Sequence, residues 1–169
     1  MWVKVAVAKP IEDFARLFGA KLSLDRDLVV KRKGKFFLLS RSLRKLAEKC
    51  GDWLFAGTYL GKVENGRFSP SFPLLFMIAD QAQNKVVVDD KAAWLFVCGR
   101  DIFKEGILET YGSRGKGAYT LVFNRHGECL GFGRIERNLD KAESGVVVKN
   151  ILDIGDFLRR ERSTKISEI

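Results

Sequence analysis

Two strand-like runs around a turn constrain the fold of this chain more than any other stretch. Tyr119 to Phe123 and Leu130 to Ile135 flank the turn residues Asn124 to Glu128, which is the pattern of a β-hairpin. Gly145 to Ile154 adds one more run rich in β-branched residues, as expected for a strand. The second half of the chain is therefore predicted to be a small, mostly antiparallel, barrel-like β module.

The residues before the hairpin are expected to complete this module. Ala92 to Cys98 is an almost unbroken apolar run ended by Gly99, and it predicts a strand buried on both faces. Asp101 is expected to cap a short helix that runs through Glu105, with Gly106 as its left-handed stop.

Helix and hairpin signals alternate in the first half. Helices are predicted to begin at Pro10, near Ser40 and at Pro73, and hairpins to turn at Lys33-Gly34 and Asn65-Gly66. The expected core-facing residues of the three helices are Ile11, Phe14, Ala15 and Phe18; Leu43, Leu46, Ala47 and Cys50; and Leu75, Ile78, Ala79 and Ala82. This pattern predicts a mainly antiparallel sheet with packed helices, so the fold class of the whole chain is α+β.

The domain boundary is placed at Asp89-Asp90, after a short predicted strand from Lys85 to Val88. Residues 1–89 then form an N-terminal α/β interaction domain and residues 90–169 a C-terminal β-barrel domain. No low-complexity linker separates the two parts, and a chain of 169 residues with 46% hydrophobic residues can bury a core in each.

Charge and hydropathy bound the function. Thirty Lys and Arg against 21 Asp and Glu give a net charge of +9, which favours a polyanionic partner such as nucleic acid. No apolar run approaches the length of a membrane span, and Met1 to Pro10 lacks the core of a signal peptide. A cytoplasmic monomer without a membrane partner is expected, or a nucleolar protein if the source is eukaryotic.

Neither a metal site nor a catalytic centre is indicated. Cys50, Cys98 and Cys129 are widely spaced among apolar residues and are predicted to be reduced core residues. The one histidine, His126, is expected to be an exposed turn residue, so nucleophilic triads lack their usual parts. No cofactor is therefore expected.

A first basic feature spans residues 31–45 and contains no acidic residue. Its cations are Lys31, Arg32, Lys33, Lys35, Arg41, Arg44 and Lys45. They are either solvated surface residues or a secondary patch that contacts nucleic acid, and the sequence leaves both readings open.

A second feature is the glycine-rich stretch Gly112 to Gly117. It does not satisfy the pattern of a phosphate-binding loop that precedes a helix, so nucleotide hydrolysis is not expected. It is either a plain connection between strands or a loop in which Arg114 and Lys116 contact RNA phosphates.

A third feature is the C-terminal end of the chain. Residues 156–161 predict a closing turn, with Phe157 and Leu158 facing inward and Arg159 and Arg160 facing outward. The basic residues there are Arg159, Arg160, Arg162 and Lys165. They form either a frayed basic tail or a site that pairs with phosphates and stacks on bases.

The phrases in this half resemble a known family. The stretches LFVCGRDIFKEGI, CLGFGRIER and ILDIGDFLRRE resemble a PUA domain, an RNA-binding module. The upstream stretch LSRSLRKLAEKCGDWLFAGTYLGKVENGRFSPSF, followed by KVVVDDKAAWLF, resembles the Nip-seven family of ribosome-assembly factors, in which a small α/β domain precedes a PUA domain. The resemblance extends from about Leu38 to the C-terminal end of the chain.

This resemblance implies a non-catalytic, archaeal-type factor in precursor rRNA processing and large-subunit assembly. Its PUA domain is expected to bind single-stranded U-rich RNA and its N-terminal domain other assembly proteins. The RNA site carried over from the family lies at Arg159 and Arg160, with Arg162 and Lys165 matching in type, and at Arg100, Lys104 and Gly106 around the short helix.

Two other functions stay open at this stage. PUA domains accompany RNA-modifying enzymes such as pseudouridine synthases and transglycosylases, although about 90 upstream residues are few for such a catalytic domain. The third reading is a protein scaffold whose basic charge serves solubility alone.

Overall fold

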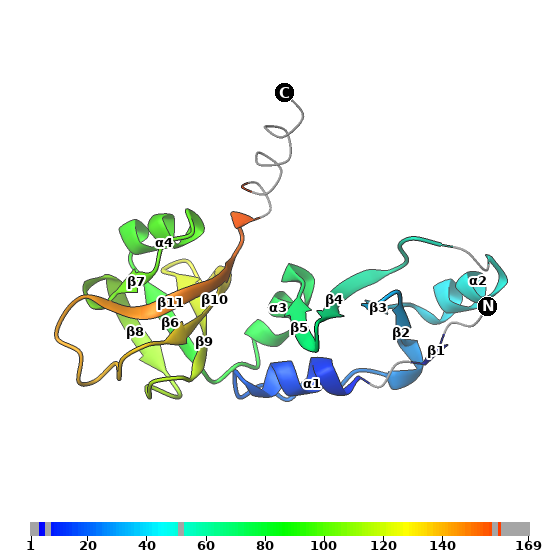
Figure 1. Cartoon of the computed structure of the whole chain (residues 1–169), viewed down its shortest axis with the longest axis horizontal. Coiled ribbons are helices and arrows are strands. Elements are labelled where there is room, and N and C mark those ends of the chain that lie inside the picture. The colour runs from blue at the N-terminus through cyan, green and yellow to red at the C-terminus, as the bar shows by residue number, and fades with distance from the viewer. Residues whose placement is uncertain (1–3, 6–7, 51–52, 157–158, 160–169) are drawn as a thin grey trace, which may run out of the picture. The chain divides into compact units, whose positions relative to one another are not determined.

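The computed structural model describes residues 4–5, 8–50, 53–156 and 159 (Figure 1). Contacts between residues divide the chain into two compact units. The N-terminal unit comprises residues 1–16 and 20–81, and the C-terminal unit comprises residues 17–19 and 82–169. The short segment 17–19 thus belongs to the C-terminal unit although it precedes most of the N-terminal one.

A five-stranded antiparallel sheet forms the N-terminal unit, with its strands in sequence order. The strands are β1 (Lys4–Val5), β2 (Val29–Arg32), β3 (Lys35–Leu38), β4 (Thr58–Glu64) and β5 (Arg67–Pro70). Both predicted hairpins are confirmed. Lys33 and Gly34 turn with φ of 46° and 78°, and Asn65 and Gly66 with 51° and 73°, as a two-residue hairpin turn requires.

Three helices accompany this sheet, α1 (Lys9–Arg16), α2 (Arg41–Cys50) and α3 (Phe72–Ala79), together with a short 3-10 helix, η1 (Arg26–Leu28). The predicted core residues of α1 and α3 are buried. Those of α2 are largely not: Ala47 is buried, but Leu46 is 55% exposed and Cys50 is exposed as well. Helix α2 therefore contacts its core along a narrower stripe than its apolar spacing predicts.

The C-terminal unit contains a curled, six-stranded sheet in the order β7-β11-β10-β9-β6-β8. Its strands are β6 (Lys85–Val88), β7 (Ile102–Phe103), β8 (Ile107–Tyr111), β9 (Tyr119–Asn124), β10 (Cys129–Ile135) and β11 (Val146–Asp153). The predicted hairpin β9–β10 and the predicted strand β11 are confirmed, and His126 is exposed at the hairpin tip. Strand β8 has no counterpart among the predicted strands.

Strand β6 corrects the predicted domain boundary. It pairs antiparallel with β8 and parallel with β9, so it is an internal strand of the C-terminal sheet rather than the last strand of the N-terminal domain. Val86 and Val88 lie fully buried in that core. The boundary falls between residues 81 and 82, and not at residues 89 and 90, because sheet pairing decides which core a strand joins.

The apolar run predicted as a buried strand is instead a helix, α4 (Asp90–Val97). The Asp89 side chain caps it by accepting a hydrogen bond of 2.7 Å from the Ala92 backbone amide. Gly99 follows its end with φ of 85°, a conformation that favours glycine. Phe96 alone in this helix is fully buried, because one stripe of the helix faces the sheet.

The helix predicted from Asp101 is also wrong. Ile102 and Phe103 form β7, and Lys104 to Gly106 form a short 3-10 turn, η2 (Lys104–Gly106). Asp101 accepts a hydrogen bond from the Asn150 amide on β11 instead of capping a helix. Gly106 does not have a positive φ, so its role is not the left-handed stop that was expected.

The cysteine prediction holds in part. Cys129 is buried on β10, whereas Cys50 and Cys98 are exposed. Among the described residues there is no helix long and apolar enough to span a membrane. Nor do the described residues contain a group of three or more His, Cys, Asp or Glu side chains placed to hold a metal ion.

Candidate nucleic-acid interface

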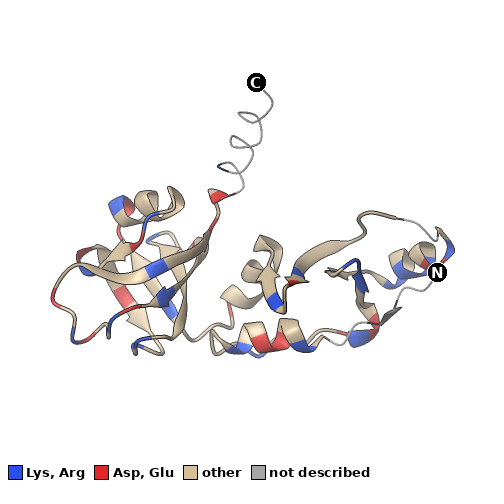
Figure 2. Cartoon of the chain, in the orientation of Figure 1, with Lys and Arg blue, Asp and Glu red and all other residues tan. Residues whose placement is uncertain are grey.

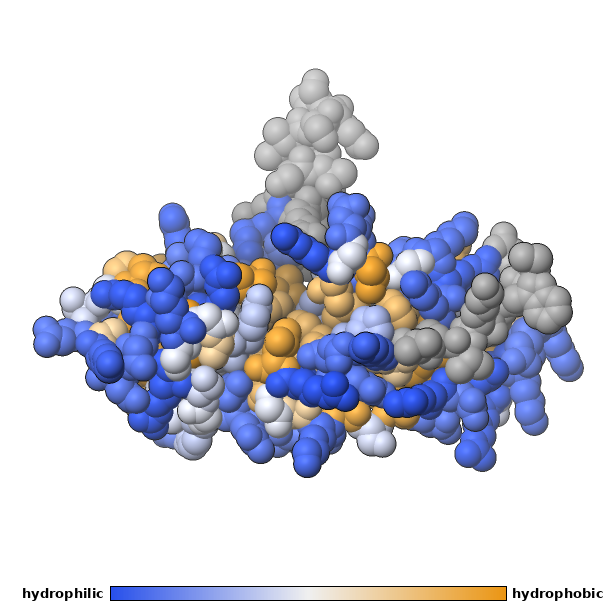
Figure 3. Space-filling model, turned by 60° about the horizontal axis from the view of Figure 1, so that its bottom comes forward, coloured by the Kyte–Doolittle hydropathy of each residue, from blue (hydrophilic) through white to orange (hydrophobic). Residues whose placement is uncertain are grey.

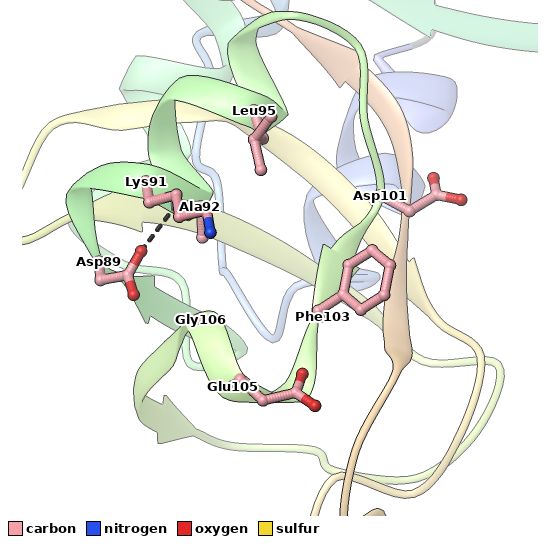
Figure 4. Close-up of a pocket in the computed structure, with 8 residues that line it drawn as sticks. All are labelled: Asp89, Lys91, Ala92, Leu95, Asp101, Phe103, Glu105 and Gly106. Carbon is pink, nitrogen blue, oxygen red and sulfur yellow. Dashed lines mark hydrogen bonds between the residues drawn. The ribbon is translucent and has the colours of Figure 1, made fainter.

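A pocket of about 430 Å³ lies in the C-terminal unit between α4, β7 and η2 (Figure 4). Its lining residues are Asp89, Lys91, Ala92, Leu95, Asp101, Phe103, Glu105 and Gly106. Ala92 and Leu95 come from α4, and Phe103 comes from β7. The pocket thus offers an apolar wall with polar groups at its edges.

Gly106 permits the close approach of η2 to α4 that shapes this pocket. A Cβ atom at this position would lie 2.5 Å from the Ala92 Cβ, a separation that real side chains do not show. The Asp89 amide also donates to the Gly106 carbonyl over 2.9 Å, which joins the start of α4 to the end of η2. Any larger residue at either position would push these elements apart.

The pocket edge carries three carboxylates and one lysine, so it is a poor phosphate site. Each carboxylate accepts a hydrogen bond from a backbone amide. The donor to Asp89 is Ala92, the donor to Asp101 is Asn150 and the donor to Glu105 is Gly145. Carboxylates accept hydrogen bonds and repel phosphates, whereas the exocyclic amino groups and ring N–H groups of nucleobases are donors. The pocket therefore suits a base edge or an apolar plane better than it suits a phosphate.

Two aromatic side chains are exposed on the elements that form the pocket, and one of them, Phe103, lines it. Trp94 on α4 is 70% exposed and Phe103 on β7 is 52% exposed. Figure 3 shows apolar residues reaching the surface among hydrophilic ones on one face of the molecule. Exposed aromatic rings are the side chains on which unpaired bases stack in single-strand-binding proteins.

The two cations predicted near the short helix differ in their surroundings. Arg100 is exposed, and no ion pair joins its guanidinium to another described residue. The Lys104 ammonium donates to the Leu139 carbonyl over 2.7 Å, which holds it against the loop before β11. Arg100 is therefore available for a phosphate, while Lys104 has a structural contact to give up first.

The two cations of the glycine-rich loop between β8 and β9 also differ in whether a carboxylate pairs with them. Arg114 forms an ion pair of 2.7 Å with Asp140 and also donates to the Thr110 carbonyl. Lys116 is exposed and has no ion pair with another described residue. Of the two predicted phosphate contacts, Lys116 is the one not neutralised by a carboxylate.

Arg159 does not face outward as predicted. Its guanidinium makes two parallel hydrogen bonds to the Asp153 carboxylate, of 2.9 and 2.7 Å, and a further one to the Val97 carbonyl at the end of α4. Asp153 is only 2% exposed, and its hydrogen bond raises the pKa of Arg159 above the ordinary value. Arg159 thus joins Asp153 at the end of β11 to the C-terminal end of α4.

The glycines beside Arg159 leave room for this contact. A Cβ atom on Gly99 would lie 3.2 Å from the guanidinium carbon, and one on Gly155 would lie 2.9 Å from the nearer terminal nitrogen. The other predicted cations of this segment, Arg160, Arg162 and Lys165, lie outside the described residues, as do Phe157 and Leu158.

The predicted basic patch of the N-terminal unit is divided between several surfaces. Register places Lys31 opposite Phe36, on the opposite face of the sheet from Arg32 and Lys35, which face each other across the hairpin. The helix cations are Arg41, Arg44 and Lys45, of which Arg44 pairs with Glu48 over 3.1 Å. Lys33 sits exposed in the turn.

Lys and Arg occur in both parts of the chain (Figure 2), but the net positive charge is larger in residues 1–81 because fewer acidic residues lie there. Residues 1–81 hold 15 of the 30 Lys and Arg but only 8 of the 21 Asp and Glu, a net charge of +7. Residues 82–169 hold the other 15 cations and 13 acids, a net charge of +2. Electrostatic attraction for a polyanion therefore comes mainly from residues outside the pocket-bearing unit.

Sequence reasoning missed the pocket, its lining residue Phe103 and the exposed Trp94 on the neighbouring helix. Phe103 and Trp94 were assigned to a helix and a buried strand, which hid their exposure. The signals that point to α4 are present: Asp89 stands three residues before Ala92, and Gly99 follows the apolar run, which are ordinary start and stop signals of a helix.

Comparisons with known proteins agree with this fold. Residues 84–162 match the model of the UPF0113 PUA domain. A UPF0113 protein of Archaeoglobus fulgidus is 33% identical over 113 residues, a match that spans 64% of this chain and 64% of that relative.

Two solved structures share the fold. A conserved PUA domain protein from Thermoplasma acidophilum has a TM-score of 0.60 at 20% identity and covers 91% of this chain and 93% of its own. A PUA domain from Aeropyrum pernix, solved as a tartrate complex, has a TM-score of 0.61 at 16% identity and covers 89% and 83%. The C-terminal unit therefore has the fold of a PUA domain, and residues 84–162 are similar to the UPF0113 PUA domain.

Proposed function

We propose that this protein binds single-stranded RNA through its PUA domain, with the pocket between α4, β7 and η2 as the base-contacting part of the site. The observation that carries the proposal is this pocket, with its exposed Phe103 and its three hydrogen-bond-accepting carboxylates, in a domain of the PUA type. An unpaired base stacks on the ring, and its donor groups face the carboxylates.

Cations around the pocket are proposed to hold the RNA backbone. Arg100 and Lys116 are exposed in this domain, and Arg160, Arg162 and Lys165 follow it in the sequence. Arg159 has a different role in the proposal, because its charge is already paired with Asp153. It fixes the segment from which the later cations extend.

The cellular role we propose is that of a non-catalytic factor in precursor rRNA processing and large-subunit assembly. The resemblance of the sequence to the Nip-seven family supports this role and a preference for U-rich single strands. In this proposal the N-terminal unit also contacts other assembly proteins, and no cofactor is required.

Binding of a labelled U-rich single-stranded RNA to the full chain across a salt series tests the proposal. If about five cations contact phosphates, the logarithm of the binding constant falls against the logarithm of salt with a slope of about −3 to −4. The triple variant Arg160→Gln, Arg162→Gln, Lys165→Gln should reduce this slope by about 2. Arg159 is kept in this variant because its ion pair with Asp153 stabilises the fold.

The pocket is tested separately with Phe103→Ala. Loss of a stacked base costs about 1–3 kcal/mol of binding free energy, whereas the control Leu108→Ala removes an equally exposed aliphatic side chain and should have little effect. Equal losses in both variants would remove the pocket from the site. Absence of RNA binding by the wild type would overturn the proposal, and conversion of uridine to pseudouridine by the purified protein would favour an enzyme instead.

A further inference from the structure

Three cations lie side by side across the N-terminal sheet. Register places Arg32 on β2 opposite Lys35 on β3, and Lys35 opposite Lys62 on β4. Directly opposite residues of neighbouring strands point to the same face, so the three side chains form one row, which we call the cation row. Lys62 was not among the cations singled out in the sequence, because register alone brings it to the other two.

This arrangement is unfavourable for the isolated fold. Like charges directly opposite each other on a sheet are destabilising, and neighbouring strands are only about 4.8 Å apart. Glu64 compensates Lys62 through an ion pair of 2.6 Å, which lowers the pKa of the Glu64 carboxyl. Lys35 is exposed and has no ion pair with another described residue, so an external anion would relieve the repulsion in the row.

A cluster of aromatic rings lies next to the cation row on the same face of the sheet. The Arg32 guanidinium lies 4.8 Å from the centre of the Trp53 ring, and Trp53 packs edge-on against Phe37 at 5.4 Å. Phe37 in turn packs against Phe55 at 5.2 Å and pairs in register with Tyr59. Burial raises the pKa of Tyr59, and the nearby Lys62 ammonium acts in the opposite direction.

One ring of this cluster is open to solvent. Phe55 is 64% exposed although its ring packs against the rings of Phe37 and Tyr59, so it is held in place while most of it faces solvent. A fixed, exposed ring beside cations has the composition of a single-strand-binding surface, in which backbone charges and stacked bases are bound together. An acidic peptide would satisfy the cations but would not need the ring.

We propose that the cation row and Phe55 form a second contact for single-stranded RNA in the N-terminal unit, with a phosphate at Lys35, a second phosphate that replaces Glu64 as the partner of Lys62, and a base on the Phe55 ring. This inference rests on the proposed RNA-binding function and adds a separate site to it. The net charge of +7 on residues 1–81 supports a polyanion as the ligand of this unit.

The charge part is tested with the full chain and the same U-rich RNA. The double variant Lys35→Gln, Lys62→Gln should reduce the salt slope by about 1.4, since each phosphate contact on a single strand contributes about 0.7. Arg32 is kept because it packs on Trp53. The matched control Lys9→Gln, Lys21→Gln removes the same charge from exposed residues of the same unit outside the row and should leave the slope unchanged.

The aromatic part is tested with Phe55→Ala against Leu54→Ala. Phe55→Ala should weaken binding about tenfold, within the range of one stacked base. Leu54 is adjacent and more exposed, at 84%, but has no ring, so its variant should bind like the wild type. Thermal melting of each variant checks that the unit stays folded.

The outcomes separate this inference from the function on which it rests. Wild-type binding that the Phe103→Ala variant loses, but that the row and Phe55 variants keep, would overturn the second site and retain the PUA site. An acidic protein as the true partner of the row would give the same unchanged RNA binding. A lower slope in the row variant but not in its control supports the second site.

Discussion

The two units of this chain differ in how their positive charge is balanced. In the PUA unit cations are paired with carboxylates, as in Arg114 with Asp140, Arg134 with Glu136 and Arg159 with Asp153, and the net charge of residues 82–169 is only +2. In the N-terminal unit some cations also pair with carboxylates, as in Lys62 with Glu64, but the cation row holds like charges side by side and the net charge of residues 1–81 is +7.

This difference separates two parts of the proposed RNA binding. A pocket with acceptor groups and exposed rings selects bases but attracts a polyanion weakly, whereas a basic surface attracts any nucleic acid without selecting it. The unit that holds the proposed base-contacting pocket is therefore not the unit with the larger net positive charge. We expect variants of the two units to change different properties of binding and stability.

The largest effect is expected from Arg159→Ala, which should destabilise the PUA unit and leave the N-terminal unit unchanged. Breaking a fully buried ion pair costs about 3–5 kcal/mol, and because the Arg159 side chain is 39% exposed we expect about 2–3 kcal/mol. Hydrogen exchange of the β9 and β10 amides, compared with those of β2 and β3, measures each unit separately.

A matched control and a pH series sharpen this prediction. Arg134→Ala breaks an exposed pair and should cost less than about 1 kcal/mol. Because the pKa of Arg159 is raised in the fold, the stability from its pair is present below the ordinary arginine pKa and is lost only above it. The loss should therefore be equal at pH 6 and pH 8, and equal losses for the two arginine variants would contradict the prediction.

A smaller effect is expected from Gly106→Val, which places a side chain where η2 meets Ala92. Overpacking of this kind costs about 1–3 kcal/mol, and it should also weaken RNA binding because the pocket is distorted. Gly115→Val is the control, because a Cβ atom on Gly115 meets no atom within 4 Å and its φ is not positive. Urea unfolding and RNA binding by both variants provide the comparison.

In the N-terminal unit we expect a substitution to increase stability instead of decreasing it. Lys35→Gln removes one charge from the cation row and should stabilise the unit by about 0.5 kcal/mol at low salt, in contrast to the loss expected for Arg159. The gain should vanish near 1 M salt, where exposed charges are screened. Lys21→Gln, outside the row, should give no gain, and a destabilised Lys35 variant would remove the difference between the units.

The smallest effect concerns Cys129 in the PUA sheet. Burial raises the pKa of its thiol, so the stability gained by keeping it neutral is present below the ordinary thiol pKa and is lost as the pH rises through it. Between pH 7 and 8.5 the loss should be no more than about 0.4 kcal/mol. Cys129→Ala should lack this part of the pH dependence, which urea unfolding at the two pH values measures.

Much of the fold could be predicted from the sequence where local signals decide it. The hairpins at Gly34, Gly66 and Gly127 depend on turn residues with positive φ, and the structure has them there. The run from Ala92 to Cys98 could not be assigned by periodicity, because seven apolar residues suit a buried strand or a short helix equally. The caps at Asp89 and Gly99 decide it.

The site was harder to predict because it depends on contacts between distant residues. Nothing near Arg159 in the sequence shows that Asp153 is buried, so a basic tail was the simpler interpretation. Gly106 was expected to end a helix in a left-handed conformation, but instead its missing side chain allows Ala92 to approach closely. Lys62 joins Arg32 and Lys35 only once the register of three strands is known.

The segment 17–19 has a consequence for folding during synthesis. The Phe18 ring packs edge-on against Tyr119 and Phe132 of the PUA unit. Its backbone carbonyl accepts hydrogen bonds from the amides of Gln83 and Asn84. At about 5–20 residues per second, Phe18 leaves the ribosome roughly 6–23 s before Phe132 does. The PUA core is thus completed by an aromatic residue that is made well before the rest of that core, and a fragment that starts at residue 82 would be translated without it.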